Sequence, residues 1–184
     1  LKGLNVIWEL GLSIEELAEI SSEIGSDIAF CVYGGTALAT GRGEKISALP
    51  NIPGCWIVLA KPSISVSTPT IYKELQVDNV EHPDTQKMIE SIKNGDLDGI
   101  FAATGNVLES VTLEKNPQVK RIKDRMLAFG AEAALMSGSG PTVFALIKQY
   151  SRAKRVYNGL RGFCEEVYMV RPWSEGENDT NINY

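Results

Sequence analysis

Several features that mark other classes of protein are scarce or missing in this sequence. Its 184 residues include a single histidine, and no apolar run approaches the length needed to span a bilayer. The net charge is −5, and no basic stripe offsets the acidic balance. Binding to nucleic-acid phosphates needs such a stripe, so the composition argues against a nucleic-acid partner as well as against a membrane span.

Cysteine is also scarce, and its placement is uninformative for catalysis. Cys31, Cys55 and Cys164 lie far apart and form no C-x-x-C pair. Such a set is typical of free thiols in a reducing compartment, so we expect buried structural cysteines in a cytoplasmic protein. His82 cannot build a metal site alone, and we predict no protein metal ligands.

The start of the chain lacks the usual signals. Leu1 is not Met, no signal-peptide pattern follows, and residues 2–10 already have a helical pattern without a cap. We therefore expect the chain to begin inside a structural element, as a fragment of something longer.

What is present first is a short helical unit. Ser13 and Glu16 have the spacing of a capping box, and Gly25 is a plausible end for the helix that follows. Asp27 is then predicted to lie in a loop directly after that helix. A β-hairpin is predicted over 36–49.

A second unit is expected after the Pro- and Gly-rich segment 50–54. Helical and strand periodicities alternate along it, and residues 174–184 are polar and aperiodic, as in a disordered tail. The order strand, helix, strand, strand, helix, strand is the split βαβ or ferredoxin-like arrangement. The predicted elements are a strand over 55–60, a helix from Thr68, helices over 83–93, 97–114 and 117–129, strands over 132–136 and 142–147, a helix over 151–161 and a strand over 166–171.

Two short motifs carry the chemistry. In 25–30 a carboxylate follows the end of a helix, and 136–144 contains the glycine–serine turn Ser-Gly-Ser-Gly between apolar runs. A turn of small residues lets backbone N–H groups approach phosphate oxygens, and a lone carboxylate can orient or deprotonate a hydroxyl group. Together the motifs suggest phosphoryl transfer to an alcohol.

Four segments resemble one protein family, and the resemblance extends from about Leu1 to Arg171. They are 25–44, 61–68, 105–113 and 136–144. In this order they closely resemble the GHMP kinase superfamily, and within it the kinases that phosphorylate the 2-hydroxyl of 4-diphosphocytidyl-2-C-methyl-D-erythritol in non-mevalonate isoprenoid synthesis. The resemblance implies ATP and Mg²⁺ as cofactors, that alcohol and ATP as small-molecule partners, and no nucleic acid or membrane partner.

The resemblance also implies a fold and a domain division. Residues 1–50 would be the remnant of a ribosomal-protein-S5-like kinase N-domain, and residues 51–173 a ferredoxin-like C-terminal domain, giving an α+β protein with a tail over 174–184. The family's catalytic lysine, much of its cytidine pocket and its main ATP loop would lie in a segment missing from this chain. We therefore expect this chain to be inactive alone.

Five residues are assigned to the site through the resemblance, each beside a structural alternative. Asp27 matches the catalytic aspartate, or it caps a turn. Thr68 matches a position near the substrate, or it is a helix N-cap ahead of a proline. Gly138, Ser139 and Gly140 match the glycine motif beside the ATP phosphates, or they form a hairpin turn that needs positive φ.

Other residues fit structural roles. Asn106 is favoured as a capping residue, and Trp8 and Trp56 lie in apolar stretches typical of a core. The functional alternatives are another GHMP kinase, acting on mevalonate or homoserine, and a non-catalytic ferredoxin-like module that binds a ligand. Asp27 discriminates between enzyme and module, because a binding module does not need that carboxylate.

Overall fold

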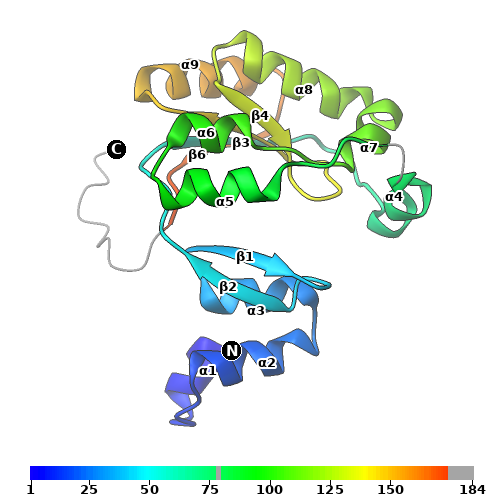
Figure 1. Cartoon of the computed structure of the whole chain (residues 1–184). Coiled ribbons are helices and arrows are strands. Elements are labelled where there is room, and N and C mark those ends of the chain that lie inside the picture. Colours follow the sequence, from blue (N-terminus) through cyan, green and yellow to red (C-terminus); the bar gives the residue numbers. More distant parts are fainter. Residues whose placement is uncertain (78–79, 174–184) are drawn as a thin grey trace. The chain divides into compact units, whose positions relative to one another are not determined.

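The computed structural model describes residues 1–77 and 80–173, so the tail predicted over 174–184 lies outside the described residues. The protein mixes helix and sheet and divides into two compact units (Figure 1). Unit 1 comprises residues 1–52 with Trp173, and unit 2 comprises residues 53–172. None of the helices in the described ranges combines the length and apolar character of a membrane span.

Unit 1 consists of helices followed by a two-stranded antiparallel sheet. The predicted capping box is confirmed: the Glu16 N–H donates to Ser13 Oγ at 3.1 Å, and the Ser13 N–H donates to Glu16 Oε2 at 2.8 Å. The elements are α1 (Lys2–Ile7), α2 (Ile14–Ser22), α3 (Ser26–Tyr33), β1 (Thr36–Thr40) and β2 (Lys45–Leu49).

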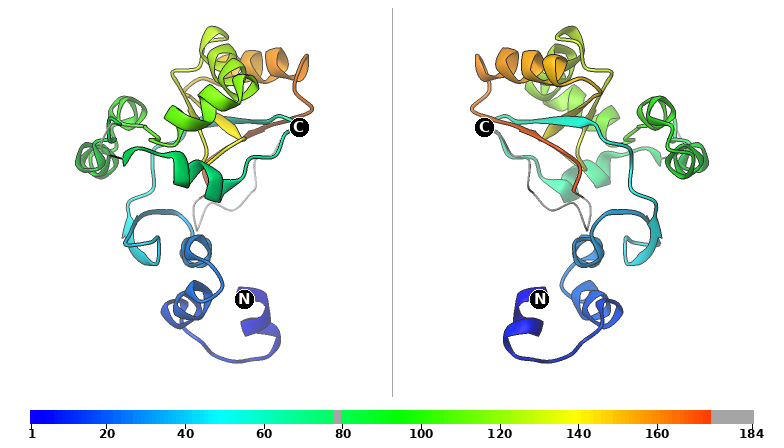
Figure 2. Two further views of the ribbon diagram at one scale, coloured as in Figure 1. Left: turned by 90° about the vertical axis from the view of Figure 1, so that its right-hand side faces the viewer. Right: turned by 90° about the vertical axis from the view of Figure 1, so that its left-hand side faces the viewer.

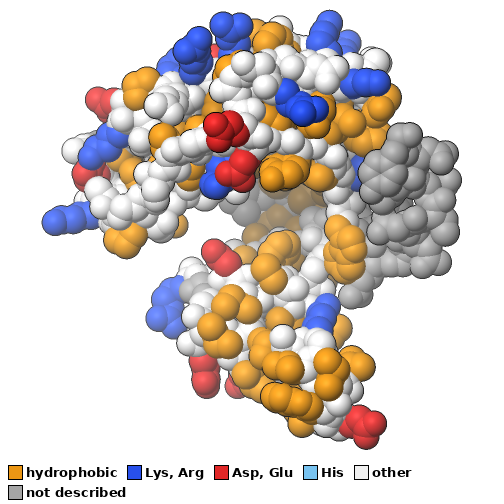
Figure 3. All heavy atoms as spheres, turned by 180° about the vertical axis from the view of Figure 1, so that it is seen from behind, with side chains coloured by type: hydrophobic (Ala, Val, Ile, Leu, Met, Phe, Trp, Pro, Cys, Tyr) orange, Lys and Arg blue, Asp and Glu red, His pale blue; other side chains and the backbone are white. Residues whose placement is uncertain are grey.

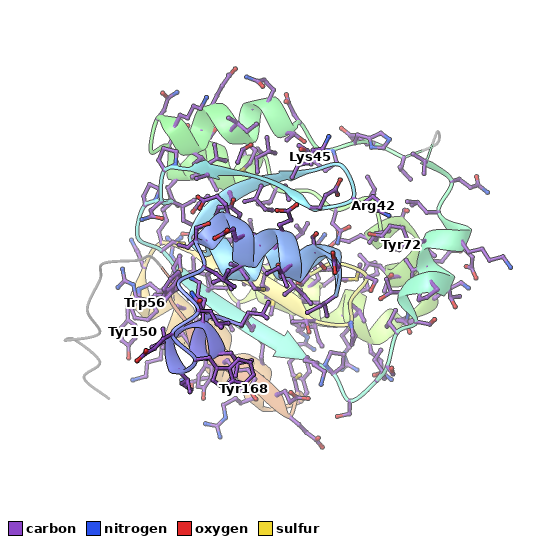
Figure 4. All side chains as sticks on the ribbon, turned by 90° about the horizontal axis from the view of Figure 1, so that it is seen from below. Arg42, Lys45, Trp56, Tyr72, Tyr150 and Tyr168 are labelled. Atoms are coloured by element: carbon purple, nitrogen blue, oxygen red, sulfur yellow. The ribbon has the colours of Figure 1, made fainter. Side chains whose placement is uncertain are left out.

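The predicted hairpin is formed by β1 and β2, with Thr36 opposite Leu49. Its turn uses a left-handed Gly41, and the Arg42 N–H donates to Glu44 Oε2 at 2.6 Å. Backbone hydrogen bonds from the turn lower the pKa of Glu44. The turn therefore organises itself locally, with Arg42 and Lys45 at its exposed end (Figure 4).

The core of unit 1 is small. It contains four buried apolar side chains, while many others of this unit are exposed and lie on its surface in Figure 3. The prediction of Trp8 as a core residue is wrong, because α1 buries none of its residues and Trp8, directly after it, is 63% exposed. The buried four are Leu17, Ala18, Ala29 and Val32.

Unit 2 is built on a four-stranded antiparallel sheet in the order β4-β5-β3-β6. β3 is central: Trp56 pairs with Ile147 of β5, and Ile57 pairs with Val170 of β6. All four predicted strands are present, and each observed end lies within one residue of the predicted one. Their bounds are β3 (Trp56–Lys61), β4 (Ala133–Met136), β5 (Val143–Ile147) and β6 (Glu166–Val170).

The long helices α8 and α9 pack on one face of this sheet (Figures 1 and 2). Their apolar faces supply much of the main core, including Val119, Met126, Val156 and Leu160, which are fully buried. The helices of unit 2 are α4 (Thr68–Glu74), α5 (Thr85–Lys93), α6 (Leu97–Ala102), α7 (Glu109–Lys115), α8 (Pro117–Ala128) and α9 (Tyr150–Arg161).

A single helix predicted over 97–114 is wrong, because a loop separates α6 from α7. The Thr104 hydroxyl donates to the Phe101 carbonyl as α6 ends. Asn106 Oδ1 then accepts the Leu108 N–H at 3.0 Å and forms a local turn before α7. These side chains offer the backbone an alternative to the helical hydrogen bond, and the helix stops there.

Trp56 is half-buried and packs against the core, as predicted for it. Its ring also lies 5.0 Å from the Tyr150 ring, beside it in Figure 4. The Arg171 guanidinium lies 4.7 Å from the Trp56 centroid, a geometry suited to a cation–π contact. Trp56 therefore ties the start of α9 and the residue after β6 to the sheet.

The three cysteines differ in burial, and we expect them to differ in reactivity. Burial raises the pKa of the Cys55 and Cys164 thiols, whereas Cys31 is exposed, so the prediction of a buried Cys31 is wrong. A raised pKa lowers the thiolate fraction, and thiolate is the nucleophile. We expect a maleimide to label only Cys31 in the native protein at neutral pH, as read by peptide mass spectrometry. Labelling of Cys164 at the rate seen in denaturant would contradict this.

Candidate functional site

The glycine–serine loop, residues 137–141, joins β4 to β5 and has a defined internal structure. The Ser137 N–H donates to the Thr142 carbonyl at 2.8 Å, and the Gly140 N–H donates to the Ser137 carbonyl at 2.9 Å. Gly138 and Gly140 have φ of 55° and 84°, in the left-handed region that strains residues with a Cβ. The glycines are therefore a conformational requirement of this loop.

The carbonyl groups in and beside this loop are held from one side. Asn106 Nδ2 donates to the Met136 carbonyl at 2.9 Å and to the Gly138 carbonyl at 2.8 Å. The hydroxyl of Thr112, a fully buried residue, donates to the Ser139 carbonyl at 3.2 Å. The segment from Asn106 to Thr112 thus anchors the loop, and the capping role predicted for Asn106 is only part of what this side chain does.

The N–H groups of Gly138 and Ser139 are left over from these interactions. Within the described ranges neither has an acceptor, and Gly138 is exposed while Ser139 is half-buried. Successive free N–H groups in a turn of small residues form a concave site for an anion. The loop therefore has two backbone donors available for a phosphate.

Thr68 reaches the loop from a distant part of the sequence. Its Oγ1 lies 2.7 Å from Ser139 Oγ, so a hydrogen bond joins α4 to the loop. Its prediction as an N-cap is wrong, because α4 starts one residue earlier and Ser67 is the N-cap. The Thr68 hydroxyl is thereby freed from capping and becomes part of the loop's surroundings.

Asp27 lies in the first turn of α3 and is exposed. The predicted loop position is wrong, since α3 begins directly after Gly25, whose carbonyl accepts the Ile28 N–H at 3.1 Å. An exposed carboxylate at this place can accept a hydrogen bond or a proton from a ligand hydroxyl. Asp27 belongs to unit 1, whereas Thr68 and the glycine–serine loop belong to unit 2.

Sequence reasoning missed two charged residues beside the loop. Glu109 Oε1 accepts the Met136 N–H at 2.8 Å, and Glu109 Oε2 lies 2.5 Å from Lys123 Nζ. The only available signal was the resemblance of 105–113 to the kinase family, because both interactions join residues far apart in sequence. No group of three or more His, Cys, Asp or Glu side chains in the described residues could hold a metal ion.

Comparison with known proteins identifies relatives of this chain. Residues 88–166 match the family model "GHMP kinases C terminal". The 4-diphosphocytidyl-2-C-methyl-D-erythritol kinase of Listeria monocytogenes serotype 4a is 97% identical over 181 residues, which cover 98% of this chain and 62% of that relative. The kinase of the same name from Enterococcus faecalis is 60% identical over 171 residues, 93% of this chain and 60% of that relative. The chain thus spans about three fifths of the length of these relatives.

Solved structures show the same fold. A crystal structure of 4-(cytidine 5'-diphospho)-2C-methyl-D-erythritol kinase superposes with a TM-score of 0.76 and 25% identity, over 92% of this chain and 60% of that one. Homoserine kinase from Cytophaga hutchinsonii superposes with a TM-score of 0.73 at 19% identity, over 92% of this chain and 62% of that one. The second likeness is one of fold alone.

Proposed function

Since this chain belongs to the GHMP kinase family, we propose that the whole protein transfers the γ-phosphoryl group of ATP to the 2-hydroxyl of 4-diphosphocytidyl-2-C-methyl-D-erythritol. The observation that carries this proposal is the near-identity to the Listeria monocytogenes kinase of that name over almost the whole chain. Free thiols in the described residues suit a reducing compartment, and we place the enzyme in the cytoplasm.

The glycine–serine loop is proposed to bind phosphate oxygens of ATP. Its support is the pair of free N–H groups on Gly138 and Ser139, with Gly140 holding the turn and Thr68 bonded to Ser139. Preorganised backbone donors stabilise negative charge that moves among phosphate oxygens during phosphoryl transfer. Thr68 is hydrogen-bonded to this loop, and this position also suits a contact between its hydroxyl and bound substrate.

Asp27 is proposed to orient the substrate hydroxyl and to accept its proton as the new phosphate ester bond forms. Its exposure at the start of α3 leaves the carboxylate oxygens free for this task. Phosphoryl transfer commonly uses Mg²⁺ bound to the nucleotide phosphates. We propose that Mg²⁺ acts here in the same way, bound to the phosphates, and we name no protein ligand for it.

We also propose a family architecture for each of the two units. The strand order β4-β5-β3-β6, with two helices on one face, supports a ferredoxin-like C-terminal domain over 51–173. Residues 1–50 are proposed to be part of a ribosomal-protein-S5-like kinase N-domain. The division into unit 1 and unit 2 falls close to this boundary.

The test is an assay of the full-length form, here defined as this chain completed with the remaining residues of the Listeria monocytogenes kinase. ADP release should be strong with 4-diphosphocytidyl-2-C-methyl-D-erythritol and negligible with homoserine or mevalonate. Transfer to homoserine or mevalonate instead would replace this proposal with the other branch of the family. Absence of transfer to all three would leave a ligand-binding module.

Thr68→Val is expected to raise the KM for ATP in the full-length form by about threefold to tenfold, because a net hydrogen bond is worth about 1 kcal/mol. Valine has the shape of threonine without the hydroxyl that bonds Ser139. Thr70→Val is the matched control. Thr70 lies on the same helix as Thr68, but its hydroxyl donates to the N-cap residue Ser67 and not to the loop. Equal KM values in the two variants would remove Thr68 from the site.

A further inference from the structure

We propose that Glu109 and Lys123 form a positioning pair that fixes the glycine–serine loop, so that the N–H groups of Gly138 and Ser139 stay presented to a nucleotide phosphate. The role of the phosphate rests on the function proposed above. The positioning of the loop rests on the contacts of these side chains alone.

Both oxygens of the Glu109 carboxylate are engaged. One accepts the Met136 N–H at 2.8 Å, and the other lies 2.5 Å from Lys123 Nζ. The side chains of Glu109 and Lys123 are only 13% and 22% exposed, which makes this the most buried ion pair among those of the described residues. Solvent screens such a pair less than a surface pair, so its geometry is better defined.

The backbone N–H that Glu109 accepts lies where β4 ends and the glycine–serine loop begins. Met136 is the last residue of β4, which lies at the edge of the sheet, and the glycine–serine loop begins at the next residue. An N–H at a sheet edge has no strand partner, and Glu109 supplies the acceptor. Since Glu109 starts α7 and Lys123 lies in α8, two helices define where the loop begins.

The lysine has a second, electrostatic consequence. A carboxylate without a counter-ion beside a loop that binds phosphate would repel the phosphate. Lys123 pairs with that charge, so Glu109 can hold the loop without opposing the ligand. The pair therefore combines a mechanical anchor with local charge neutrality, which a lone Glu109 would not provide.

The test uses variants of each partner with a control on the same helix. Glu109→Gln removes the charge with little change of shape, and Lys123→Met keeps the aliphatic stem. Glu114→Gln on α7 and Lys120→Met on α8 alter exposed residues of the same types. Amide hydrogen exchange is followed in this chain at Met136 and Gly140, whose N–H groups are hydrogen-bonded to Glu109 and to the Ser137 carbonyl. The KM for each substrate is measured in the full-length form.

We expect Glu109→Gln and Lys123→Met each to accelerate exchange at Met136 and Gly140 and to raise the KM for ATP about tenfold, the effect of losing a charged hydrogen bond. The KM for the alcohol should stay unchanged, which a general loss of folding would not produce. The double variant should be no worse than the more impaired single variant, because both remove one interaction. Lys123→Arg, which keeps the charge, should have the same KM for ATP as the unsubstituted protein.

Two results would overturn the positioning role. One is a folded Glu109→Gln protein whose exchange at Met136 and Gly140 equals that of Glu114→Gln. The other is accelerated exchange with an unchanged KM for ATP, which would separate the loop from the nucleotide. An inactive unsubstituted full-length form would instead count against the proposed function, and the exchange measurement would still decide whether the pair holds the loop.

Discussion

Asp27→Asn should lower kcat of the full-length form by about a hundredfold or more, the usual contribution of a general base. Asparagine is nearly isosteric and keeps a hydrogen-bond acceptor, but it cannot take the proton of the substrate hydroxyl. The KM for the alcohol should therefore change little, because orientation and binding survive while proton transfer does not. Steady-state kinetics at saturating ATP measure both parameters.

Asp98→Asn is the matched control. Asp98 is also an exposed aspartate in the first turn of a helix, α6, and its known partner is Lys148. Its replacement should leave kcat unchanged, because loss of an exposed ion pair costs little. An Asp27→Asn enzyme with the kcat of the Asp98→Asn control would exclude Asp27 as the base and leave it a structural residue of α3.

Gly140→Ala should destabilise unit 2 by about 2 to 4 kcal/mol, combining left-handed backbone strain with overpacking. The new Cβ would lie 2.7 Å from Met136 Sδ and 3.4 Å from Thr112 Cγ2. Met136 and Thr112 are buried and cannot move aside easily. Urea denaturation of this chain, followed by circular dichroism, measures the loss of stability. The full-length form should also bind ATP more weakly.

Gly138→Ala separates the two causes. Gly138 also has positive φ, but a Cβ there meets nothing within 4 Å. It should cost only about 1 to 2 kcal/mol, the strain of a left-handed residue. If the two alanine variants were equally stable, the packing of the loop against Met136 and Thr112 would be looser than the contacts indicate.

Local patterns were sufficient for much of unit 2. Apolar runs bounded by turns located its strands, and helical periodicity located α8, which buries Val119, Ile122 and Met126. The capping box of Ser13 and Glu16 was equally readable, because both partners lie within one turn. These features depend on residues close together in sequence, where periodicity and capping rules apply.

The site was less accessible because it depends on contacts between distant residues. Thr68 fits the N-cap pattern ahead of a proline, yet Ser67 starts the helix and Thr68 bonds Ser139. Asn106 fits a local turn, and its amide also holds carbonyls of Met136 and Gly138. Neither periodicity nor spacing encodes such partners. The prediction of Trp8 as a core residue was wrong for a related reason, because an apolar side chain does not reveal whether another part of the protein covers it.

The central position of β3 has a consequence for the order of assembly. β3 is the first strand of its sheet in the sequence, yet both of its neighbours, β5 and β6, come after all the intervening helices. During synthesis this strand leaves the ribosome without a partner, and its apolar residues wait until Val143–Ile147 emerge. Strand pairings between residues this distant in sequence slow folding, and they prolong the exposure of unpaired apolar strands that are prone to aggregation. We therefore expect the nascent chain to be most prone to aggregation while α4 to α8 are being translated.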